Sequence, residues 1–250
     1  MIHLKSEKEL ELIKESGRML KYAVDALIPT IEVGMSTKEI DDRAQQLLHE
    51  AGAELSFNKV PGYHWATCLP VNEQAVHTPP SSYRLKSGDL LTVDIGAYYE
   101  GFHTDYATSL VVGEAKNEKI LHFLDTGKRA VDEAIKKAVC GGYLGEISKC
   151  LYDIISKEGY FVMKDLTGHG VGRELHEDPL IPGFLDRPVE QTYRLQHGLT
   201  VAVEVIYSMG SEKIRYDKRD GWSISSSDSS LTACFEKSIA ITDESTFILT

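Results

Sequence analysis

Apolar residues recur every three or four positions in four stretches of the chain, which is the period of an amphipathic helix. Two of these stretches open with a capping box, at Ser6-Glu7-Lys8-Glu9 and at Ser36-Thr37-Lys38-Glu39. Proline or glycine follows each stretch and stops it. The predicted helices run from Ser6 to before Pro29, from Ser36 to before Gly52, from about Asn117 to Val139 and from about Leu144 to Glu158.

Runs rich in Val, Ile, Tyr, Phe and Thr predict the β-strands. A β-hairpin is expected at Leu90–Gly113, where two such runs flank the turn dipeptide Glu100-Gly101. Short strands and loops are expected between Ala53 and Ser87. An irregular span of about thirty-six residues separates the first two strands of the second half, and spans of that length are usually functional. The second-half strands are predicted at Phe161–Met163, Thr200–Tyr207 and Leu231–Thr242.

The order of elements repeats, because each half of the chain is two helices followed by strands. Ser16-Gly17-Arg18 precedes Gly52 by 35 residues, and Thr126-Gly127-Lys128 precedes Gly159 by 32 residues. This repetition indicates an internal duplication about a pseudo-two-fold axis. No low-complexity linker divides the halves. We therefore expect one α/β (α+β) domain over residues 1–250, with halves of roughly 1–115 and 116–250.

The predicted hairpin has one apolar face and one face that carries two acids. Its turn pairs Asp94 with Ala107 and Asp105 with Gly96, and side chains alternate between the faces. Asp94 and Asp105 then become diagonal neighbours with Cβ atoms about 7 Å apart or less, close enough to share one cation or a pair. The alternative is an amphipathic hairpin with a solvated polar face. Aspartate is a poor strand former, which favours the metal site.

Two further acids interrupt apolar strands, and three histidines stand near glycines or turns. Glu204 lies in VAVEVIY and Glu236 in ACFEKSIAI. A buried carboxylate needs a partner, so each glutamate is paired either with a basic side chain or with a bound cation. His169 lies in GHGVG, whose spacing does not match a dinucleotide fingerprint. Of the nine histidines, we select His169, His176 and His77 as candidates.

Composition excludes several classes of partner. The hydrophobic fraction of 42% and the charged fraction of 26% are those of an ordinary globular protein. A net charge of −11 argues against DNA held on a broad basic face. No apolar run approaches the roughly 18 residues of a membrane span, and the first residues lack the apolar core of a signal peptide. The four cysteines have no C-x-x-C spacing, so a reduced, cytoplasmic protein is expected.

The spacing of these acids and histidines resembles that of the type I methionine aminopeptidases. Asp94 and Asp105 are followed by GHGVGRELHEDP, by Glu204 in an apolar strand and by Glu236 fourteen residues after Trp222. The stretches NEQAVHTPP and GFHTDYATS add to the resemblance, which runs from about Ile13 to the end of the chain. It implies the pita-bread fold, in which pseudo-symmetric halves surround a curved antiparallel sheet with helices outside.

The same resemblance implies a ligand set for two divalent metal ions. Asp94 would bind the first ion, Asp105 and Glu236 would bridge both, and His169 and Glu204 would complete the second. Four carboxylates and one imidazole suit Co²⁺, Mn²⁺, Fe²⁺, Zn²⁺ or Ni²⁺. A metal pair about 3.5 to 4 Å apart shares a water, which would attack the scissile carbonyl.

The resemblance also assigns roles around the metals. Glu204 would be the proton shuttle, and His176 would donate a hydrogen bond to the scissile carbonyl as it becomes an oxyanion. His77 would contact the amide nitrogen beyond the cut. The pocket for the methionine side chain would be lined by Tyr63, Cys68, Leu175 and Trp222. The sequence departs from the usual family pattern at Leu175, Gly183 and Val205.

The implied activity is removal of the initiator methionine from the N-termini of nascent chains when the second residue is small. The protein would be a cytoplasmic monomer, with transient contact to the ribosome. Two alternatives stay open: a proline-directed aminopeptidase or prolidase of the same fold, and a non-catalytic pita-bread binding module. Prolidases carry an extra N-terminal domain, and binding modules typically lose metal ligands, so both alternatives are disfavoured.

Overall fold

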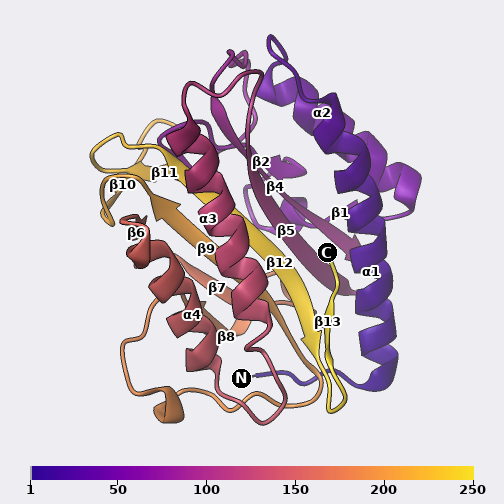
Figure 1. The fold of residues 1–250 in the computed structure, drawn as a ribbon. Helices are drawn as coiled ribbons and strands as arrows, with labels where there is room; N and C mark the ends of the chain where they lie inside the picture. Colours follow the sequence, from indigo (N-terminus) through magenta and orange to yellow (C-terminus); the bar gives the residue numbers. More distant parts are fainter. Residues whose placement is uncertain (1) are drawn as a thin grey trace.

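The computed structural model describes residues 2–250, and its helices and strands follow the predicted order (Figure 1). Both capping boxes form at the predicted serines, Ser6 and Ser36. The α-helices are α1 (Glu7–Leu27), α2 (Thr37–Ala51), α3 (Glu118–Ile135) and α4 (Leu144–Lys157). Three short 3₁₀ turns are η1 (Ile28–Thr30), η2 (Phe57–Lys59) and η3 (Val189–Gln191).

The strands form a large antiparallel sheet and a small one. The large sheet has the order β1-β4-β5-β12-β9-β7-β8, with β2 added on β4, β6 on β9 and β13 on β12. The small sheet has the order β10-β11-β3. The strands are β1 (Glu54–Leu55), β2 (Thr67–Cys68), β3 (Gln74–Val76), β4 (Leu90–Tyr99), β5 (Phe102–Val111), β6 (Phe161–Val162), β7 (Thr167–Gly170), β8 (Glu177–Pro182), β9 (Leu199–Ser208), β10 (Ile214–Tyr216), β11 (Ile224–Ser226), β12 (Thr232–Ile241) and β13 (Thr246–Ile248).

The four helices cover one face of the large sheet (Figure 1). Apolar side chains of α1 and α2 pack with those of β4 in one buried cluster, and those of α3 and α4 pack with β9 and β12 in another. The two clusters correspond to the two halves of the chain. This arrangement confirms the predicted pita-bread fold with helices outside a curved antiparallel sheet. None of the described helices combines the length and the apolar run that a membrane crossing requires.

Two predicted boundaries were wrong. Helix α3 ends at Ile135 instead of Val139, because the N–H groups of Lys137 and Ala138 bond carbonyls only three residues back and tighten the chain into a turn. The long span after Met163 is not irregular throughout, since it contains β7 and β8. Glycine and proline in these strands interrupt the alternation of apolar and polar residues that would have predicted them. The strands form because β7 pairs with both β8 and β9.

The repeated glycines of the two halves have a packing reason. A Cβ added at Gly17 in α1 would lie 2.3 Å from the carbonyl oxygen of Leu249, and one at Gly127 in α3 would lie 2.4 Å from Oη of Tyr207. Neither helix therefore has room for a side chain at this position. The repeated glycine allows a close approach in both halves, to a backbone carbonyl in the first and to two aromatic side chains in the second.

Candidate metal centre

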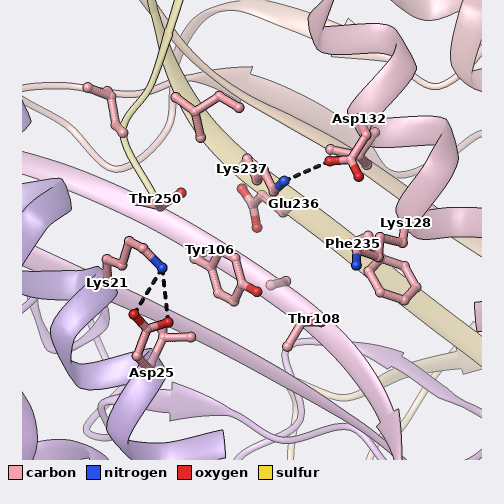
Figure 2. Close-up of a pocket in the computed structure, with 15 residues that line it drawn as sticks. Lys21, Asp25, Tyr106, Thr108, Lys128, Asp132, Phe235, Glu236, Lys237 and Thr250 are labelled. Atoms are coloured by element: carbon pink, nitrogen blue, oxygen red, sulfur yellow. Dashed lines mark hydrogen bonds and ion pairs between the residues drawn. The ribbon is translucent and has the colours of Figure 1, made fainter. Parts of the chain in front are cut away.

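One cavity lies on the helix side of the sheet, between α1 and α3 (Figure 2). It holds about 490 Å³, and of the residues selected from the sequence only Glu236 lines it. Its charges are largely paired with one another: Lys21 lies 2.9 Å from Asp25, and Lys237 lies 2.7 Å from Asp132. This cavity therefore offers little unpaired chemistry, and the candidate site lies on the opposite face.

The register of the large sheet places the five predicted metal ligands on one face in two adjacent rows. In the first row Asp94 of β4 pairs with Ala107 of β5, Ala107 with Glu236 of β12, and Glu236 with Glu204 of β9. The second row lies two positions further along the strands and contains Asp105 and His169. Ser238 and Ala202 link them, because Oγ of Ser238 bonds the Asp105 backbone and Ala202 pairs with both Ser238 and His169.

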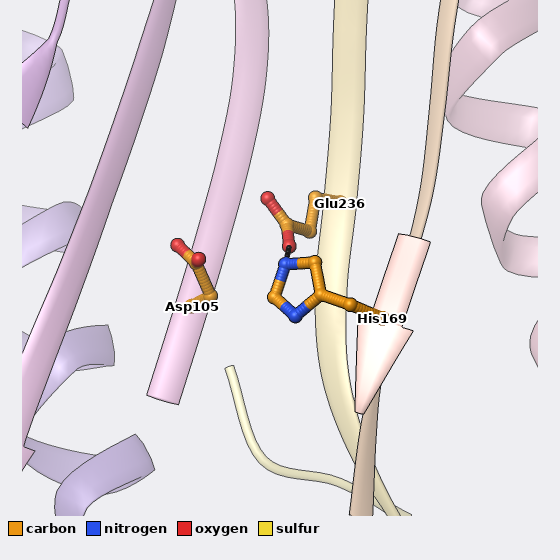
Figure 3. Close-up of side chains that lie close together, drawn as sticks. All are labelled: Asp105, His169 and Glu236. Carbon is orange, nitrogen blue, oxygen red and sulfur yellow. Dashed lines mark ion pairs between the residues drawn. The ribbon is translucent and has the colours of Figure 1, made fainter. Parts of the chain in front are cut away.

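These side chains converge on one point of the sheet. Donor atoms of Asp105, His169 and Glu236 all lie within 4.8 Å of one another (Figure 3). Nε2 of His169 lies 3.8 Å from Oε1 of Glu236 and 3.8 Å from Oε1 of Glu204. All four of these residues are buried, with exposed fractions between 3% and 9%. The geometry fits a shared cation better than a hydrogen-bonded cluster, because the contacts exceed hydrogen-bond distance.

The carboxyl groups are electrostatically crowded. Burial raises the pKa of Asp105 to about 7, and burial together with the charge of Asp105 raises that of Glu204 to about 8. Burial and the neighbouring acids also raise the pKa of Asp94 and Glu236 well above the usual range. Four acids in this state need either protons or a cation to neutralise them. No described Lys or Arg side chain pairs with any of the four.

The orientation of the imidazole gives a separate test of whether a metal fits. Nδ1 of His169 lies 2.9 Å from the carbonyl oxygen of Gly170, which can only accept, so Nδ1 carries the proton. Burial lowers the pKa of His169 to about 3, so Nε2 presents a lone pair toward two carboxylates. Oε1 of Glu236 is buried and accepts no hydrogen bond from the described residues. Both atoms can only accept hydrogen bonds or offer a lone pair to a metal, so they fit a divalent metal centre, for which nitrogen and oxygen ligands are expected.

Backbone contacts fix Asp105 in this row. Oγ of Ser238 accepts from the Asp105 N–H at 2.8 Å and donates to its carbonyl at 2.9 Å. Oγ1 of Thr250 donates to the same carbonyl at 3.1 Å and accepts from the Ser238 N–H at 2.9 Å. These bonds tie β5 to β12 beyond the point where their regular pairing ends at Lys237.

A cavity of about 240 Å³ opens above the acidic cluster, and all eleven residues selected from the sequence line it. Besides the five metal candidates these are His77, His176, Tyr63, Cys68, Leu175 and Trp222. His77 adopts a left-handed backbone conformation with φ of 58°, at the end of β3. The ring of His176 lies 4.4 Å from that of His169, centroid to centroid. Both candidate histidines therefore reach the cavity from segments outside the main strands.

The other end of the cavity is apolar. Phe57, Tyr63, Cys68 and Leu175 form a buried cluster there. The ring of Tyr63 makes edge contacts with Trp65 and Trp222, each with centroids 5.1 Å apart. Oη of Tyr63 donates to the carbonyl of Thr67 at 2.8 Å, which satisfies the hydroxyl of the phenol. A pocket of this kind suits an unbranched thioether side chain.

Several lining residues were not selected from the sequence. They are mostly apolar, and an apolar residue in a short loop gives no signal that separates a pocket wall from the core. Asp165 is the one charged member, and it lies in the long span after Met163 that was predicted to be irregular. The residues missed were Phe57, Val60, Val76, Asp165, Leu166, Thr167 and Ile206.

Comparison with known proteins places this site in a family. A family model described as metallopeptidase family M24 matches residues 11–243. The chain is 33% identical over 252 residues to a methionine aminopeptidase of Clostridium perfringens, covering 100% of this chain and 99% of that protein. It is 34% identical over 250 residues to methionine aminopeptidase 1 of Bacillus subtilis, with the same coverage.

Solved structures agree with the sequence relatives. The methionine aminopeptidase of Thermotoga maritima matches with a TM-score of 0.95 and 33% identity, over 100% of this chain and 99% of that one. The prolidase of Pyrococcus furiosus matches with a TM-score of 0.78 and 24% identity, and the chain covers 65% of its length. The prolidase likeness extends to the fold alone.

A buried acidic centre on a pita-bread sheet is the site of a metal-dependent peptidase, and the chain belongs to metallopeptidase family M24. Within that family, the relatives named above that match it from end to end are methionine aminopeptidases.

Proposed function

We propose that this protein is a metal-dependent methionine aminopeptidase, which removes an N-terminal methionine when the second residue is small. One observation carries the proposal: five metal-binding side chains and an apolar pocket line the same cavity of about 240 Å³. The acidic end supplies hydrolytic chemistry and the apolar end supplies side-chain selection. A metallo-exopeptidase needs both within the length of one amino acid.

The residues that would hold a metal pair are Asp94, Asp105, His169, Glu204 and Glu236. When bound, divalent ions would supply an activated water and polarise the scissile carbonyl. Among these residues, Asp105, His169 and Glu236 have ligand atoms within 4.8 Å of one another, close enough to hold an ion together. The hydrogen bonds of Ser238 to the backbone N–H and carbonyl of Asp105 would hold this residue in place in the second row.

Three side chains would handle protons and the developing charge. Glu204, which lines the cavity beside the other proposed metal ligands, would take a proton from the attacking water and return it to the departing amine. His176 would donate a hydrogen bond to the oxygen that becomes negative in the transition state. His77, which lines the same cavity, would contact the amide nitrogen beyond the cut.

The two alternative functions are less well supported. The prolidase likeness lies below 25% identity and supports only the shared fold. A binding module that had lost catalysis would lack ligands, whereas this chain retains a complete set of four acids and one imidazole. We also propose that the protein acts as a cytoplasmic monomer on the N-termini of nascent chains, with transient contact to the ribosome.

Hydrolysis of two tripeptides tests the proposal. Metal-stripped protein is supplied with Mn²⁺ or Co²⁺ and incubated with Met-Ala-Ser or Ala-Pro-Ala. We expect metal-dependent release of methionine from the first peptide and no cleavage of the second. Cleavage before proline would support the prolidase alternative, and absence of cleavage despite bound metal would support the binding module.

A further inference from the structure

A buried ion pair lies outside the acidic cluster and joins the first residues of the chain to the start of β8. Nζ of Lys5 lies 2.5 Å from Oε2 of Glu177, and the two side chains are 1% and 9% exposed. The N–H of Lys5 donates to the carbonyl of Gly198 at 2.7 Å, so its backbone is held independently of its side chain. The metal centre makes no use of this pair.

The second carboxylate oxygen of Glu177 binds the backbone just before it. Oε1 accepts from the N–H of Arg173 at 2.6 Å and from that of Glu174 at 3.2 Å. A Cβ at Gly172 would lie 2.4 Å from Cε of Lys5 and 2.8 Å from Oε1 of Glu177. The chain between β7 and β8, residues 171–176, therefore wraps around this one ion pair.

The wrapped segment carries two residues of the proposed site. Leu175 belongs to the apolar pocket, and His176 lines the acidic end of the same cavity. His176 is bonded directly to Glu177. Any movement of the glutamate carboxylate would therefore shift the His176 backbone and the reach of its imidazole.

Energetics favour a geometric role for the pair over a stabilising one. Taking two charges out of water offsets most of their attraction, and apolar residues of similar volume often give equal stability. Burial accordingly lowers the pKa of Lys5. A second ion pair, between Arg173 and Glu9 at 2.6 Å, binds the same segment from outside. The Arg173 side chain is 59% exposed, so this outer pair contributes little.

We propose that Lys5 is a positioning residue that acts through Glu177 to fix the imidazole of His176 at the scissile carbonyl. The inference rests on the proposed peptidase function and on the oxyanion role of His176 within it. If the imidazole of His176 is displaced, its hydrogen bond stabilises the transition state less, while the binding of the substrate changes little. Loss of the pair therefore lowers kcat and leaves KM and metal affinity nearly unchanged.

The test uses the Lys5→Met variant, which keeps the volume of the side chain and removes the charge. With Met-Ala-Ser and saturating Mn²⁺, we expect kcat to fall roughly ten-fold or more, since one oxyanion donor is worth about 10²–10³ in rate. KM should stay within about two-fold of wild type. Mn²⁺ affinity, measured by titration calorimetry, should match wild type, as the metal ligands are not touched.

Two comparisons make the result specific. Arg173→Met removes the outer pair of the same segment, together with the contact of the guanidinium with the Phe102 ring, and should keep kcat within about two-fold of wild type. In a His176→Ala background, Lys5→Met should cause no further loss of kcat, because the group that it positions is gone. Should Lys5→Met not fold, the double variant Lys5→Met with Glu177→Gln replaces both charges and is measured instead.

A wild-type kcat for these variants, or an equal loss in the His176→Ala background, would overturn the inference. An equal fall of kcat in Arg173→Met would also overturn it, because general loosening of the segment would then explain the effect. Failure of the proposed function is distinguishable from these outcomes. In that case the wild-type protein itself releases no methionine with metal bound.

Discussion

Glu204 shows most clearly how one residue can combine two incompatible demands. It lies in the middle of β9, a strand in which all ten residues are buried, where an apolar side chain would pack best. Its carboxyl faces Glu236 across the strand pair, and the two would repel if both were ionised. Only a metal or a proton resolves this conflict. Its position therefore points to chemistry and not to stability.

We expect Glu204→Gln to keep the fold and to lower kcat by about 10² or more, because the amide cannot carry the proton between water and amine. The metal-stripped variant should be no less stable than wild type, since one member of a repelling pair has become neutral. The measurements are kcat on Met-Ala-Ser at saturating Mn²⁺ and urea unfolding.

The matched control for this change is Glu212→Gln, which alters an exposed glutamate paired with Lys164 and should leave kcat unchanged. Metal content of both variants must be measured, because Glu204 is also a proposed ligand. A Glu204→Gln protein with near-normal kcat would remove the assigned proton-transfer role.

Among the elements, the hairpin was predicted to the register and the strands after it were not. The structure pairs Asp94 with Ala107 and Gly96 with Asp105, as the turn at Glu100-Gly101 predicted. A tight turn fixes the register of its two strands, so the local sequence is enough to predict which residues pair. Strand β7 has no such turn-fixed register, and its sequence TGHG carries no strand pattern. Its conformation depends on neighbours that lie elsewhere in the chain.

The contact of α3 with the sheet depends on Gly127. Its N–H donates to Oη of Tyr207 at 3.1 Å, and a Cβ there would lie 2.6 Å from the ring of Phe235. Alanine would improve helix propensity by about 1 kcal/mol but would force these rings apart. We expect Gly127→Ala to lower the free energy of unfolding by about 1 to 3 kcal/mol, measured by urea titration.

The neighbouring Lys128 gives the control for this prediction, because its side chain is exposed on the same helix. Lys128→Ala should change the free energy of unfolding by less than about 0.5 kcal/mol. If Gly127→Ala were as stable as wild type, the close approach would be a tolerant contact, and the repeated glycines would need another explanation.

At the scale of the whole molecule, the site lies where the two halves meet. Asp94 and Asp105 come from the first half, and His169, Glu204 and Glu236 come from the second. The sequence could identify these residues because acids within apolar strands are unusual. It could not identify Phe57 and Val60 in the pocket wall, because an apolar residue buried around a ligand cannot be told by its type from one buried in a core.

Joining the halves through acids also couples metal binding to folding. In the metal-free protein the raised pKa values of Asp105, about 7, and Glu204, about 8, mean that the folded state holds protons that the unfolded chain has released. Stability contributed by these groups is therefore lost as pH rises through those values. His169, with a pKa lowered to about 3 from 6.5, has the opposite effect at lower pH. Above about pH 6.5 His169 is neutral in both the folded and the unfolded state, so the carboxyl groups alone contribute to the change in stability among these residues.

We expect the metal-free protein to lose thermal stability between about pH 6.5 and about pH 8.5, and the rise in Tm on adding Co²⁺ to be larger at the higher pH. The ions replace the protons that the folded state would otherwise have to keep, and at high pH fewer protons compete for the ligands. Scanning fluorimetry of stripped protein with and without Co²⁺ measures both effects. Glu204→Gln should flatten the metal-free pH dependence, because it removes a carboxyl group whose pKa is raised to about 8 in the folded protein. A metal-free protein whose Tm is constant or rises over this range would show that the cluster is neutralised by something other than protons, and the assignment of a cation site to these five residues would fail with it.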